Sequence, residues 1–343
     1  MKTKVIVGLS GGIDSAMTAY LLKEDGYDVE GIYMMLHDAI EDYHTTNIAT
    51  IDKVTKFLEI PYHIVDFRDR FNKEVYEYFV QSYIDGITPN PCVKCNATIK
   101  FGLLYDEAMR LGADYLATGH YAKTDGKFIY KADDIKKDQS YFLAQIDKTH
   151  IPKIMFPISK YTKEYLKSRV ENIPEFKQFL TQKESQEICF VPDTYTQILQ
   201  KHTNIDMKGD TLDIDGNIIG YHKGYMHYTV GKRRGFYVHG AHEPHFVLSQ
   251  DKDTNTIVVG KKEQLAIYNV KINNLNMFID DTDIVCDVKL RFRSQTVKCN
   301  LKIYDDYAII DLEEAVYGVA KGQVAVFYDE DKLIGSGWII ATK

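Results

Sequence analysis

Gly8-Leu9-Ser10-Gly11-Gly12-Ile13-Asp14-Ser15 joins an apolar run at residues 5–9 to a segment whose apolar residues follow helical spacing over 16–22. Glycines let the backbone turn tightly and bring its N–H groups close to a ligand. The start of the following helix favours an anion, and Ser10 and Ser15 add hydroxyl donors. The stretch has neither the Gly-Lys-Ser/Thr ending of a Walker loop nor the G-x-G-x-x-G spacing of a dinucleotide loop. We interpret it as a phosphate-binding loop of a different type rather than as a ligand-free turn.

The chain around this loop alternates strand and helix patterns. Strand-like runs occur at 5–9, 29–34, 62–65 and 115–118, and helical patterns occur at 16–22, 48–58, 71–83 and 99–111. This alternation predicts an α/β domain with a doubly wound parallel sheet. Ligands of such sheets lie beyond the carboxyl ends of the strands, where Met34, Gly119 and His120 are expected. A core methionine and a structural histidine are the alternative interpretations.

The character of the chain changes after Lys201, because seven of the eight prolines precede it and short β-rich segments with turn pairs follow it. Strand patterns at the C-terminal end favour a small antiparallel barrel; they lie at 284–292, 296–303, 307–312, 323–328 and 333–340. We therefore expect three domains: an α/β domain at 1–200, a small central β-rich domain at 201–264 and a C-terminal β-barrel at 265–343.

Composition excludes several classes of protein. The 343 residues are 45% hydrophobic and 27% charged, which excludes a disordered chain. No apolar run approaches the roughly 18 residues of a membrane span, and the N-terminus offers no signal-peptide cleavage site, so we expect a cytoplasmic protein without a membrane partner. The net charge of −7 excludes a polybasic binder.

A nucleic-acid partner remains open, because binding needs only a local basic face. Residues 221–242 carry four basic residues, four histidines and no acid, and residues 286–302 carry five basic residues against one acid. Such stretches suit phosphate contacts with RNA. A solvated basic strand is the alternative interpretation.

Five cysteines are too few, and an odd number, for a disulfide scaffold. Cys92 and Cys95 lie in a proline-framed turn that enters a helix, with Lys94 and Lys100 nearby. A helix N-terminus and neighbouring lysines both lower the pKa of a thiol, so we predict a lowered pKa for Cys95. Cys189 lies in an apolar patch near the end of the α/β domain.

Three kinds of cysteine site fit this spacing. Structural zinc wants four ligands, often two C-x-x-C pairs, and the chain has one such pair. An iron–sulfur cluster on Cys92, Cys95 and Cys189 with one open iron position is a second interpretation. A nucleophile paired with a persulfide carrier is the interpretation we favour. Cys286 and Cys299 fall in the barrel pattern, where we expect buried strand cysteines without a chemical role.

Several stretches together resemble the bacterial tRNA-specific 2-thiouridylases, a family within the ATP pyrophosphatase superfamily whose loop reads Ser-Gly-Gly-x-Asp-Ser. They are residues 10–15, 88–101, 117–120, 137–141, 185–190, 228–235, 291–293 and 322–328. The resemblance implies an enzyme that uses ATP and Mg²⁺ to adenylate the C2 oxygen of the wobble uridine of tRNA. Persulfide sulfur then replaces that oxygen to give 2-thiouridine, with release of AMP and pyrophosphate.

The resemblance also implies roles for individual residues. Cys95 takes the nucleophile position and Cys189 the persulfide-carrying position, and the two are expected to form a disulfide during turnover. The nucleotide contacts are Gly8, Leu9, Ser10, Gly11, Gly12, Ile13, Asp14, Ser15, Met34 and Gly119. The positions facing the target base are Asn90, Pro91 and Cys92, and those contacting tRNA are His120, Lys137, Asp138, Gln139, Arg291, Phe292 and Gln323.

The expected partners are tRNA and a sulfur-donor protein, either a cysteine desulfurase or a sulfur-relay protein.

One departure from the family occurs after Met34, where Met35-Leu36-His37-Asp38 replaces the usual tryptophan and acid-rich continuation. Two rival functions are an adenylating enzyme with a nitrogen nucleophile and a nucleotide-regulated RNA-binding protein without chemistry.

Overall fold

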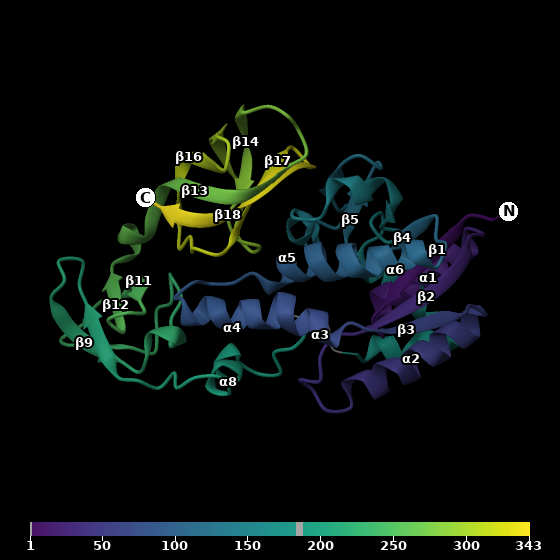
Figure 1. Ribbon diagram of the computed structural model, residues 1–343, viewed down its shortest axis with the longest axis horizontal. Coiled ribbons are helices and arrows are strands. Elements are labelled where there is room, and N and C mark those ends of the chain that lie inside the picture. The colour runs from purple at the N-terminus through teal and green to yellow at the C-terminus, as the bar shows by residue number, and fades with distance from the viewer. Residues whose placement is uncertain (1, 183–187) are drawn as a thin grey trace. The chain divides into compact units, whose positions relative to one another are not determined.

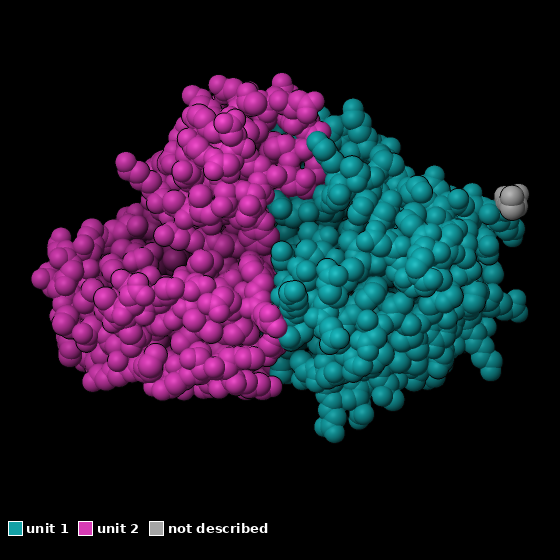
Figure 2. Space-filling view, in the orientation of Figure 1, with its two compact units in different colours: residues 1–75, 92–192, 330–334 teal, residues 76–91, 193–329, 335–343 magenta. Residues whose placement is uncertain are grey.

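The structure is a computed structural model that describes residues 2–182 and 188–343. The chain divides into two compact units (Figure 2). Unit 1 comprises residues 1–75, 92–192 and 330–334, and unit 2 comprises residues 76–91, 193–329 and 335–343. Ser185, Gln186 and Glu187, from the segment expected around the persulfide carrier, lie outside the described residues.

Unit 1 is built on a five-stranded parallel sheet in the order β3-β2-β1-β4-β7. Figure 1 labels β1 to β4. Its strands are β1 (Lys4–Leu9), β2 (Asp28–Met35), β3 (Tyr62–Asp66), β4 (Tyr115–Ala117) and β7 (Ile154–Met155). The hairpin β5 (Ala122–Thr124) and β6 (Ile129–Lys131) also belongs to this unit. The predicted doubly wound α/β fold is therefore confirmed.

The alternating residues of β1 show that both faces of this sheet are covered. Val5, Val7 and Leu9 belong to the core cluster that also contains residues of α1 and α2. On the opposite face, a Cβ on Gly8 would lie 3.3 Å from the Leu104 side chain of α6. Successive side chains of a strand point to opposite faces, so helices pack on both sides and the loops after the strands gather at one edge.

The helices of the chain are mostly short. They are α1 (Ile13–Glu24), α2 (Tyr43–Leu58), α3 (Arg68–Phe71), α4 (Glu77–Ile84), α5 (Pro91–Cys95), α6 (Leu104–Arg110), α7 (Lys163–Glu171) and α8 (Tyr195–Gln200). Two segments are π-helical, η1 (Asn72–Tyr76) and η2 (Asn96–Leu103). The 3₁₀ segments are η3 (Ser140–Leu143), η4 (Lys148–Lys153), η5 (Pro174–Leu180), η6 (Tyr225–His227) and η7 (Lys262–Leu265).

Unit 2 contains a five-stranded sheet and a barrel. The sheet has the order β10-β9-β8-β12-β11, with β8 (Gly209–Leu212), β9 (Ile218–His222), β10 (Tyr237–Val238), β11 (Phe246–Asp251) and β12 (Thr256–Gly260). The barrel follows the order β13-β16-β15-β14-β17-β18 and closes where β13 pairs with β18. Its strands are β13 (Ala266–Met277), β14 (Asp283–Lys289), β15 (Val297–Ile303), β16 (Tyr307–Tyr317), β17 (Val324–Asp329) and β18 (Lys332–Thr342).

The barrel also contains two cysteines. Cys286 and Cys299 are opposite one another on β14 and β15, both buried, with their Sγ atoms 3.7 Å apart. Their burial on barrel strands is as the sequence predicted. Within the described part of the chain, no helix has the length and apolar character needed to cross a membrane.

Candidate active site

The phosphate loop is shaped by its own hydrogen bonds. The Ser10 N–H donates to Ser15 Oγ at 3.1 Å, and the Ser15 hydroxyl donates to the Gly12 carbonyl at 2.9 Å. Gly11 has a φ of +77°, in the left-handed region that favours glycine. The loop leads into α1 through Gly12, whose position at the helix N-terminus leaves the first N–H groups of α1 without a side-chain cap. This is the geometry that an anionic phosphate group requires.

The Asp14 side chain does not cap α1. Its two carboxylate oxygens instead accept hydrogen bonds from Lys163 Nζ at 2.7 and 2.8 Å, and Oδ1 also accepts from the Tyr121 hydroxyl at 2.9 Å. Lys163 is the first residue of α7, and only 4% of its surface is exposed. A buried cation therefore stands directly behind the phosphate loop.

Sequence reasoning did not find Lys163. It lies 149 residues from Asp14 along the chain, and its local pattern is only that of a helix start. Thr162 caps α7 by accepting a hydrogen bond from the Tyr165 N–H. The cap signal predicts the helix, and only the fold brings the helix to the loop.

Gly119 closes the other side of the loop. A Cβ at this position would lie 2.8 Å from the Asp14 carbonyl carbon and 2.9 Å from the Ser15 nitrogen. Any side chain would therefore push the loop or β4 away. The structure places Gly119 directly beside the loop, and its contact with the nucleotide remains a prediction.

His120 follows Gly119 and is buried. One ring nitrogen, Nδ1, lies 2.8 Å from Thr118 Oγ1, and the other, Nε2, lies 3.5 Å from Lys100 Nζ. Burial and the nearby Lys100 charge keep the pKa of His120 well below its ordinary value, so the ring is neutral. These contacts suit a structural histidine, and a contact with tRNA remains a prediction.

Three thiols of unit 1 act on one another electrostatically. The charges of Cys92 and Cys189 raise the pKa of Cys95, and Lys100 lowers the pKa of all three. Cys95 is buried, Cys92 is half-buried and Cys189 is exposed, and all three are free. The pairing of Cys95 with Cys189 in catalysis remains a prediction.

The predicted lowering of the Cys95 pKa is wrong. Burial raises the pKa of Cys95 to about 12 and that of Cys92 to about 11, and it outweighs the opposing effect of Lys100. Desolvation also raises the pKa of Cys189, although this thiol is the exposed member and the one an external reagent meets first. Across the described ranges, no group of three or more His, Cys, Asp or Glu side chains is arranged to hold a metal ion.

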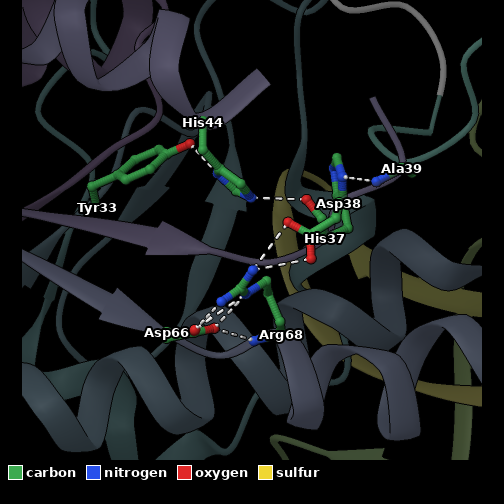
Figure 3. A network of polar contacts seen from close by, with 7 residues as sticks. All are labelled: Tyr33, His37, Asp38, Ala39, His44, Asp66 and Arg68. Atoms are coloured by element: carbon green, nitrogen blue, oxygen red, sulfur yellow. Dashed lines mark hydrogen bonds and ion pairs between the residues drawn. The ribbon is translucent and has the colours of Figure 1, made fainter. Parts of the chain in front are cut away.

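The departure after Met34 forms a small polar network at the carboxyl end of β2 (Figure 3). His44 Nε2 lies 2.8 Å from the His37 carbonyl, so it donates, and His44 Nδ1 accepts from the Tyr33 hydroxyl at 2.7 Å. Burial lowers the pKa of His37, which favours its neutral form. These local bonds anchor the segment.

Arg68 completes this network from the start of α3. It donates to both oxygens of Asp38 at 3.0 and 3.1 Å, and to both oxygens of Asp66 at 2.6–3.1 Å (Figure 3). The arginine lowers the pKa of Asp66 to about 2. The ends of β2 and β3 are therefore joined through one guanidinium group.

The same segment supports Cys189 through aromatic packing. Phe190, the next residue, lies edge-on to Phe71 at 5.6 Å between ring centroids, and Phe71 lies 6.0 Å from His37. The charge of Cys189 acts on Tyr43, whose ring packs on His37 at 4.9 Å. A chain of ring contacts thus runs from Tyr43 and His37 through Phe71 to Phe190, the residue after Cys189.

Two of the residues of unit 1 expected to contact tRNA accept hydrogen bonds from backbone N–H groups of the same unit. The buried Asp138 carboxylate accepts from the Ala132 N–H at 3.0 Å and from the Ser140 hydroxyl at 2.9 Å. The Gln139 side chain accepts from the Tyr121 N–H at 3.0 Å. Both side chains fix the loop that carries Lys137, and direct contact of all three with tRNA remains a prediction.

In unit 2, Gln323, which is expected to contact tRNA, is hydrogen-bonded to the segment just before the expected target-base residues. Gln323 Nε2 donates to the carbonyls of Thr88 and Pro89 at 3.1 and 3.0 Å, just before Asn90 and Pro91. The Asn90 N–H donates to the Tyr78 hydroxyl at 3.2 Å. Gln323 therefore holds the segment that precedes the target-base positions.

Arg291 and Phe292 follow β14, in the barrel. Both are half-buried. Lys289 Nζ lies 5.4 Å from the centre of the Phe292 ring, and the Arg291 carbonyl accepts from the Ser294 N–H and hydroxyl. They present mixed basic and aromatic character, which is common in RNA-binding surfaces.

Comparison with known proteins covers nearly the whole chain. Family models match at residues 3–193, a tRNA methyl transferase HUP domain, at 196–261, a tRNA methyl transferase PRC-barrel domain, and at 265–339, an aminomethyltransferase beta-barrel domain. The chain is 58% identical over 343 residues to "tRNA-specific 2-thiouridylase MnmA 1" of Aliarcobacter butzleri, covering 100% of this chain and 99% of that protein.

Two further relatives carry a matching name. A tRNA-specific 2-thiouridylase MnmA of Sulfurimonas denitrificans is 49% identical over 339 residues, covering 99% of each chain. One from Campylobacter jejuni is 50% identical over 337 residues, covering 98% of this chain and 99% of that protein.

Proposed function

The chain belongs to the tRNA-specific 2-thiouridylase family, and from this premise we propose that it catalyses ATP-dependent 2-thiolation of the wobble uridine of tRNA. It is a tRNA-uridine 2-sulfurtransferase that uses ATP with Mg²⁺ and releases AMP and pyrophosphate. The observation that carries the proposal is that unit 1 holds both a preformed phosphate loop and a group of three free thiols.

The ATP half of the reaction uses the loop. We assign the triphosphate to Gly8–Ser15, with Met34 and Gly119 bordering the nucleotide. The uncapped start of α1 supports this assignment, because its N–H groups attract phosphate oxygens. Mg²⁺ enters as part of the ATP substrate. The Lys163–Asp14 pair supplies a fixed cation behind the loop.

The sulfur half of the reaction uses the thiols. A urea-like carbonyl oxygen is a poor leaving group, and adenylation converts it into a phosphate ester that leaves as AMP. The Cys189 persulfide anion attacks C2, and AMP departs with the C–O electron pair. The Cys95 thiolate then attacks Cys189 Sγ, the persulfide S–S bond breaks, and its electron pair remains on the sulfur attached to C2. The resulting Cys95–Cys189 disulfide is reduced by an external dithiol.

We assign the remaining expected residues to the nucleic acid. Asn90, Pro91 and Cys92 face the target base, while His120, Lys137–Gln139, Arg291, Phe292 and Gln323 serve tRNA binding. A sulfur-donor protein, a cysteine desulfurase or a relay protein, loads Cys189, and the exposure of that thiol supports such access. We assign catalysis to domain 1–200, with domains 201–264 and 265–343 serving tRNA, and we place the enzyme in the cytoplasm with its substrate.

The test is turnover of iron-free enzyme with a small-molecule persulfide donor, ATP and unmodified tRNA, read as 2-thiouridine by nucleoside mass spectrometry. Cys189→Ser should release pyrophosphate but accept no persulfide sulfur, and Cys95→Ser should accept the sulfur yet make no thiouridine. Cys286→Ala, a change in the barrel, is the matched cysteine control and should keep full activity.

The same assay separates the rival functions. Strict dependence on reconstituted iron, with loss of activity in Cys92→Ser, would favour the cluster interpretation. Ammonia incorporation in place of sulfur would favour a nitrogen nucleophile. Binding of tRNA without release of AMP and pyrophosphate would leave an RNA-binding protein without chemistry.

A further inference from the structure

Unit 2 carries two exposed, stacked tyrosines at one edge of its five-stranded sheet. Tyr221 of β9 and Tyr237 of β10 are directly opposite in the strand register, with ring centroids 5.0 Å apart and ring planes inclined by 30°. The exposed fractions of the two residues are 44% and 47%. Because β10 is the outermost strand in the sheet order, Tyr237 is the outer ring of the pair. The pair thus presents aromatic surface on which another ring can stack.

The backbone holds this tyrosine pair in place. A Cβ on Gly220 would collide with the Tyr237 carbonyl oxygen, so β10 packs against β9 more closely than a residue with a side chain would allow. Before β10, the Tyr228 hydroxyl donates a hydrogen bond to the Gly235 carbonyl. The His239 ring packs at right angles to the Tyr237 ring, with 5.1 Å between centroids. The rings are therefore ordered before a ligand arrives, which lowers the entropy cost of binding.

Two lysines lie at one end of the tyrosine pair. The Lys208 ammonium nitrogen lies 4.8 Å from the centre of the Tyr221 ring, within the range of a cation–π contact. Lys208 directly precedes β8, and Lys223 directly follows β9. Because Gly209 pairs with His222, both lysines lie at the same end of these two strands, and both are exposed.

Two arginines lie toward the same end. β10 runs antiparallel to β9, so Arg233 and Arg234, which precede β10, lie toward the end of β9 that carries Lys223. Both arginines are exposed. The neighbouring Lys232 ammonium group is instead bonded to the His227 carbonyl at 2.6 Å. Exposed arginine thus adds to the positive charge of the lysines beside the tyrosine pair.

The acidic residues of these strands are placed differently. Asp213 and Asp215 belong to the β8–β9 turn, at the opposite end, and the Asp213 carboxylate accepts a hydrogen bond from the Asp215 N–H at 3.0 Å. Asp210 is opposite Tyr221 in the register, on the side of β9 away from Tyr237. The Tyr237 side of the pair therefore combines an exposed aromatic ring with basic residues, which is the composition of sites that bind unpaired nucleotides.

A second tyrosine stack in unit 2 has different surroundings. The rings of Tyr304 and Tyr307 lie 4.7 Å apart, inclined by 18°, and 47% of Tyr304 is exposed. The Lys271 ammonium nitrogen lies 4.0 Å from the centre of the Tyr307 ring. However, the two tyrosines flank Asp305 and Asp306 in the turn between β15 and β16, and these acids oppose an approaching phosphate. The charge around each stack, rather than stacking itself, distinguishes the two.

We propose that Tyr221 and Tyr237 form a stacking platform for an unpaired base of the tRNA, and that the basic residues beside them bind the adjacent phosphates. These basic residues are Lys208, Lys223, Arg233 and Arg234. The inference rests on the proposed function, which supplies tRNA as the ligand. It adds a base contact to the phosphate contacts expected of residues 221–242. Bases inside an RNA helix are stacked on one another, so an unpaired base is the one that offers its face to a protein ring.

Two substitutions and one control test the platform. Tyr237→Ala removes the outer ring, and Tyr237→Phe keeps the ring but loses the hydroxyl. Tyr304→Ala is the matched control, because it removes an equally exposed, stacked tyrosine from the same unit.

The first measurement is the affinity for unmodified tRNA, by filter binding. Tyr237→Ala should weaken binding by about fivefold or more, the low end of the effect of removing one base–aromatic stack. Tyr237→Phe should stay within about twofold of wild type, because the ring face carries the stack. Tyr304→Ala should bind tRNA as wild type does.

The second measurement separates stacking from charge. The slope of log affinity against log salt should be unchanged in Tyr237→Ala, because a neutral ring displaces no counterion, whereas Lys223→Met should lower the slope by about one. A blunt-ended RNA duplex, in which every base is paired, should bind wild type and Tyr237→Ala equally well.

Loss of the Tyr237 ring also removes a cross-strand pair that stabilises β10. Circular dichroism and urea unfolding check the fold of each variant. If Tyr237→Ala is unfolded, Tyr237→Leu decides the question, because leucine keeps an apolar side chain on the edge strand but has no ring face.

Two outcomes would overturn the inference. Wild-type tRNA affinity in folded Tyr237→Ala or Tyr237→Leu would show that no base stacks on this ring. Equal loss of affinity for tRNA and for the duplex would assign the tyrosine to the fold or to the phosphate backbone. A wild-type enzyme that binds tRNA with the expected tyrosine dependence but makes no 2-thiouridine would instead contradict the proposed function.

Discussion

Asp14 is an acid in a loop built for a polyanion, and the structure explains how the loop tolerates it. Lys163 and Tyr121 together take up its carboxylate, so the negative charge is compensated before a phosphate arrives. Lys163 is almost fully buried, whereas about a third of the Asp14 side chain is exposed. The pair therefore presents its acidic member toward the loop and keeps its basic member inside.

Replacing Lys163 tests this arrangement. Lys163→Met leaves the Asp14 charge without its partner, so we expect pyrophosphate release to fall by at least tenfold. We expect the free energy of unfolding to fall by about 1.5–3 kcal/mol, the usual contribution of a hydrogen bond to a charged group. Stopped-flow pyrophosphate detection and urea unfolding measure the two effects.

Asp14→Ala is the complementary change, and it should abolish pyrophosphate release while the protein stays folded. As a control, Lys160→Met alters a lysine of the same segment whose ammonium group lies 5.3 Å from the centre of the Tyr161 ring. Wild-type release from both Lys163→Met and Asp14→Ala would contradict the assignment of the loop.

The buried thiol of Cys95 gives a pH prediction. A thiol is neutral when protonated, so burial that raises its pKa to about 12 preserves the unreactive form to high pH. Alkylation of Cys95 by iodoacetamide should therefore rise about tenfold per pH unit from pH 8 to pH 10 without a plateau, since an ordinary thiol levels off above about 8.5. Peptide mass spectrometry follows the labelled residue.

The urea-denatured protein is the control for this measurement, and its Cys95 should reach a plateau in the ordinary range. A plateau near pH 8 in the folded enzyme would mean that Lys100 outweighs burial. In that case the resting enzyme would already hold the thiolate.

At the scale of elements, much of the fold could be predicted from the sequence. Apolar runs and helical spacing predicted β1 to β4, α1 and α2, and the barrel patterns predicted β14 to β18, because these elements repeat a local period. The long strand β13 (Ala266–Met277) was missed because its polar residues and bulges interrupt the alternation. The 284–292 pattern was also longer than β14, which ends at Lys289.

The candidate site was less predictable, because its properties depend on contacts between distant segments. The phosphate loop was readable as a continuous motif. The predicted shift of the Cys95 pKa had the wrong sign, because the local sequence shows a helix start and two lysines but does not show that the fold buries the thiol. Lys163 required the structure, since a distant ion pair leaves no local pattern.

Gly119, after β4, packs against the start of α1. Replacing it tests how closely these two elements must approach. In Gly119→Ala the new Cβ would meet the backbone of Asp14 and Ser15 at 2.8–3.0 Å, so the start of α1 must shift. We expect the KM for ATP to rise at least tenfold, with little change in tRNA affinity. Gly126→Ala is the matched control, because nothing lies within 4 Å of a Cβ built there, although its positive φ adds a small strain. Unchanged ATP kinetics in Gly119→Ala would place the nucleotide elsewhere.

At the scale of the whole molecule, a net charge of −7 must be reconciled with a polyanionic substrate. Local excess of positive charge resolves this, because salt screens exposed charges that lie more than about 10 Å apart at 0.1 M. The two basic stretches, residues 221–242 and 286–302, both lie in unit 2. Binding of tRNA should therefore depend on where a charge is changed rather than on the total.

Charge reversal at single positions measures this dependence. Arg233→Glu and Arg291→Glu should each weaken tRNA binding several-fold or more. Each should also lower the slope of log affinity against log salt by about one, because a lost phosphate contact releases one counterion fewer.

Arg110→Glu makes the same change in net charge at an exposed position of α6 that is paired with Glu107, and it should alter neither quantity. Filter binding between 50 and 200 mM salt, the range over which phosphate contacts dominate, gives both quantities. Equal losses in all three variants would mean that total charge governs binding, and no loss in Arg233→Glu and Arg291→Glu would mean that the RNA contacts another surface.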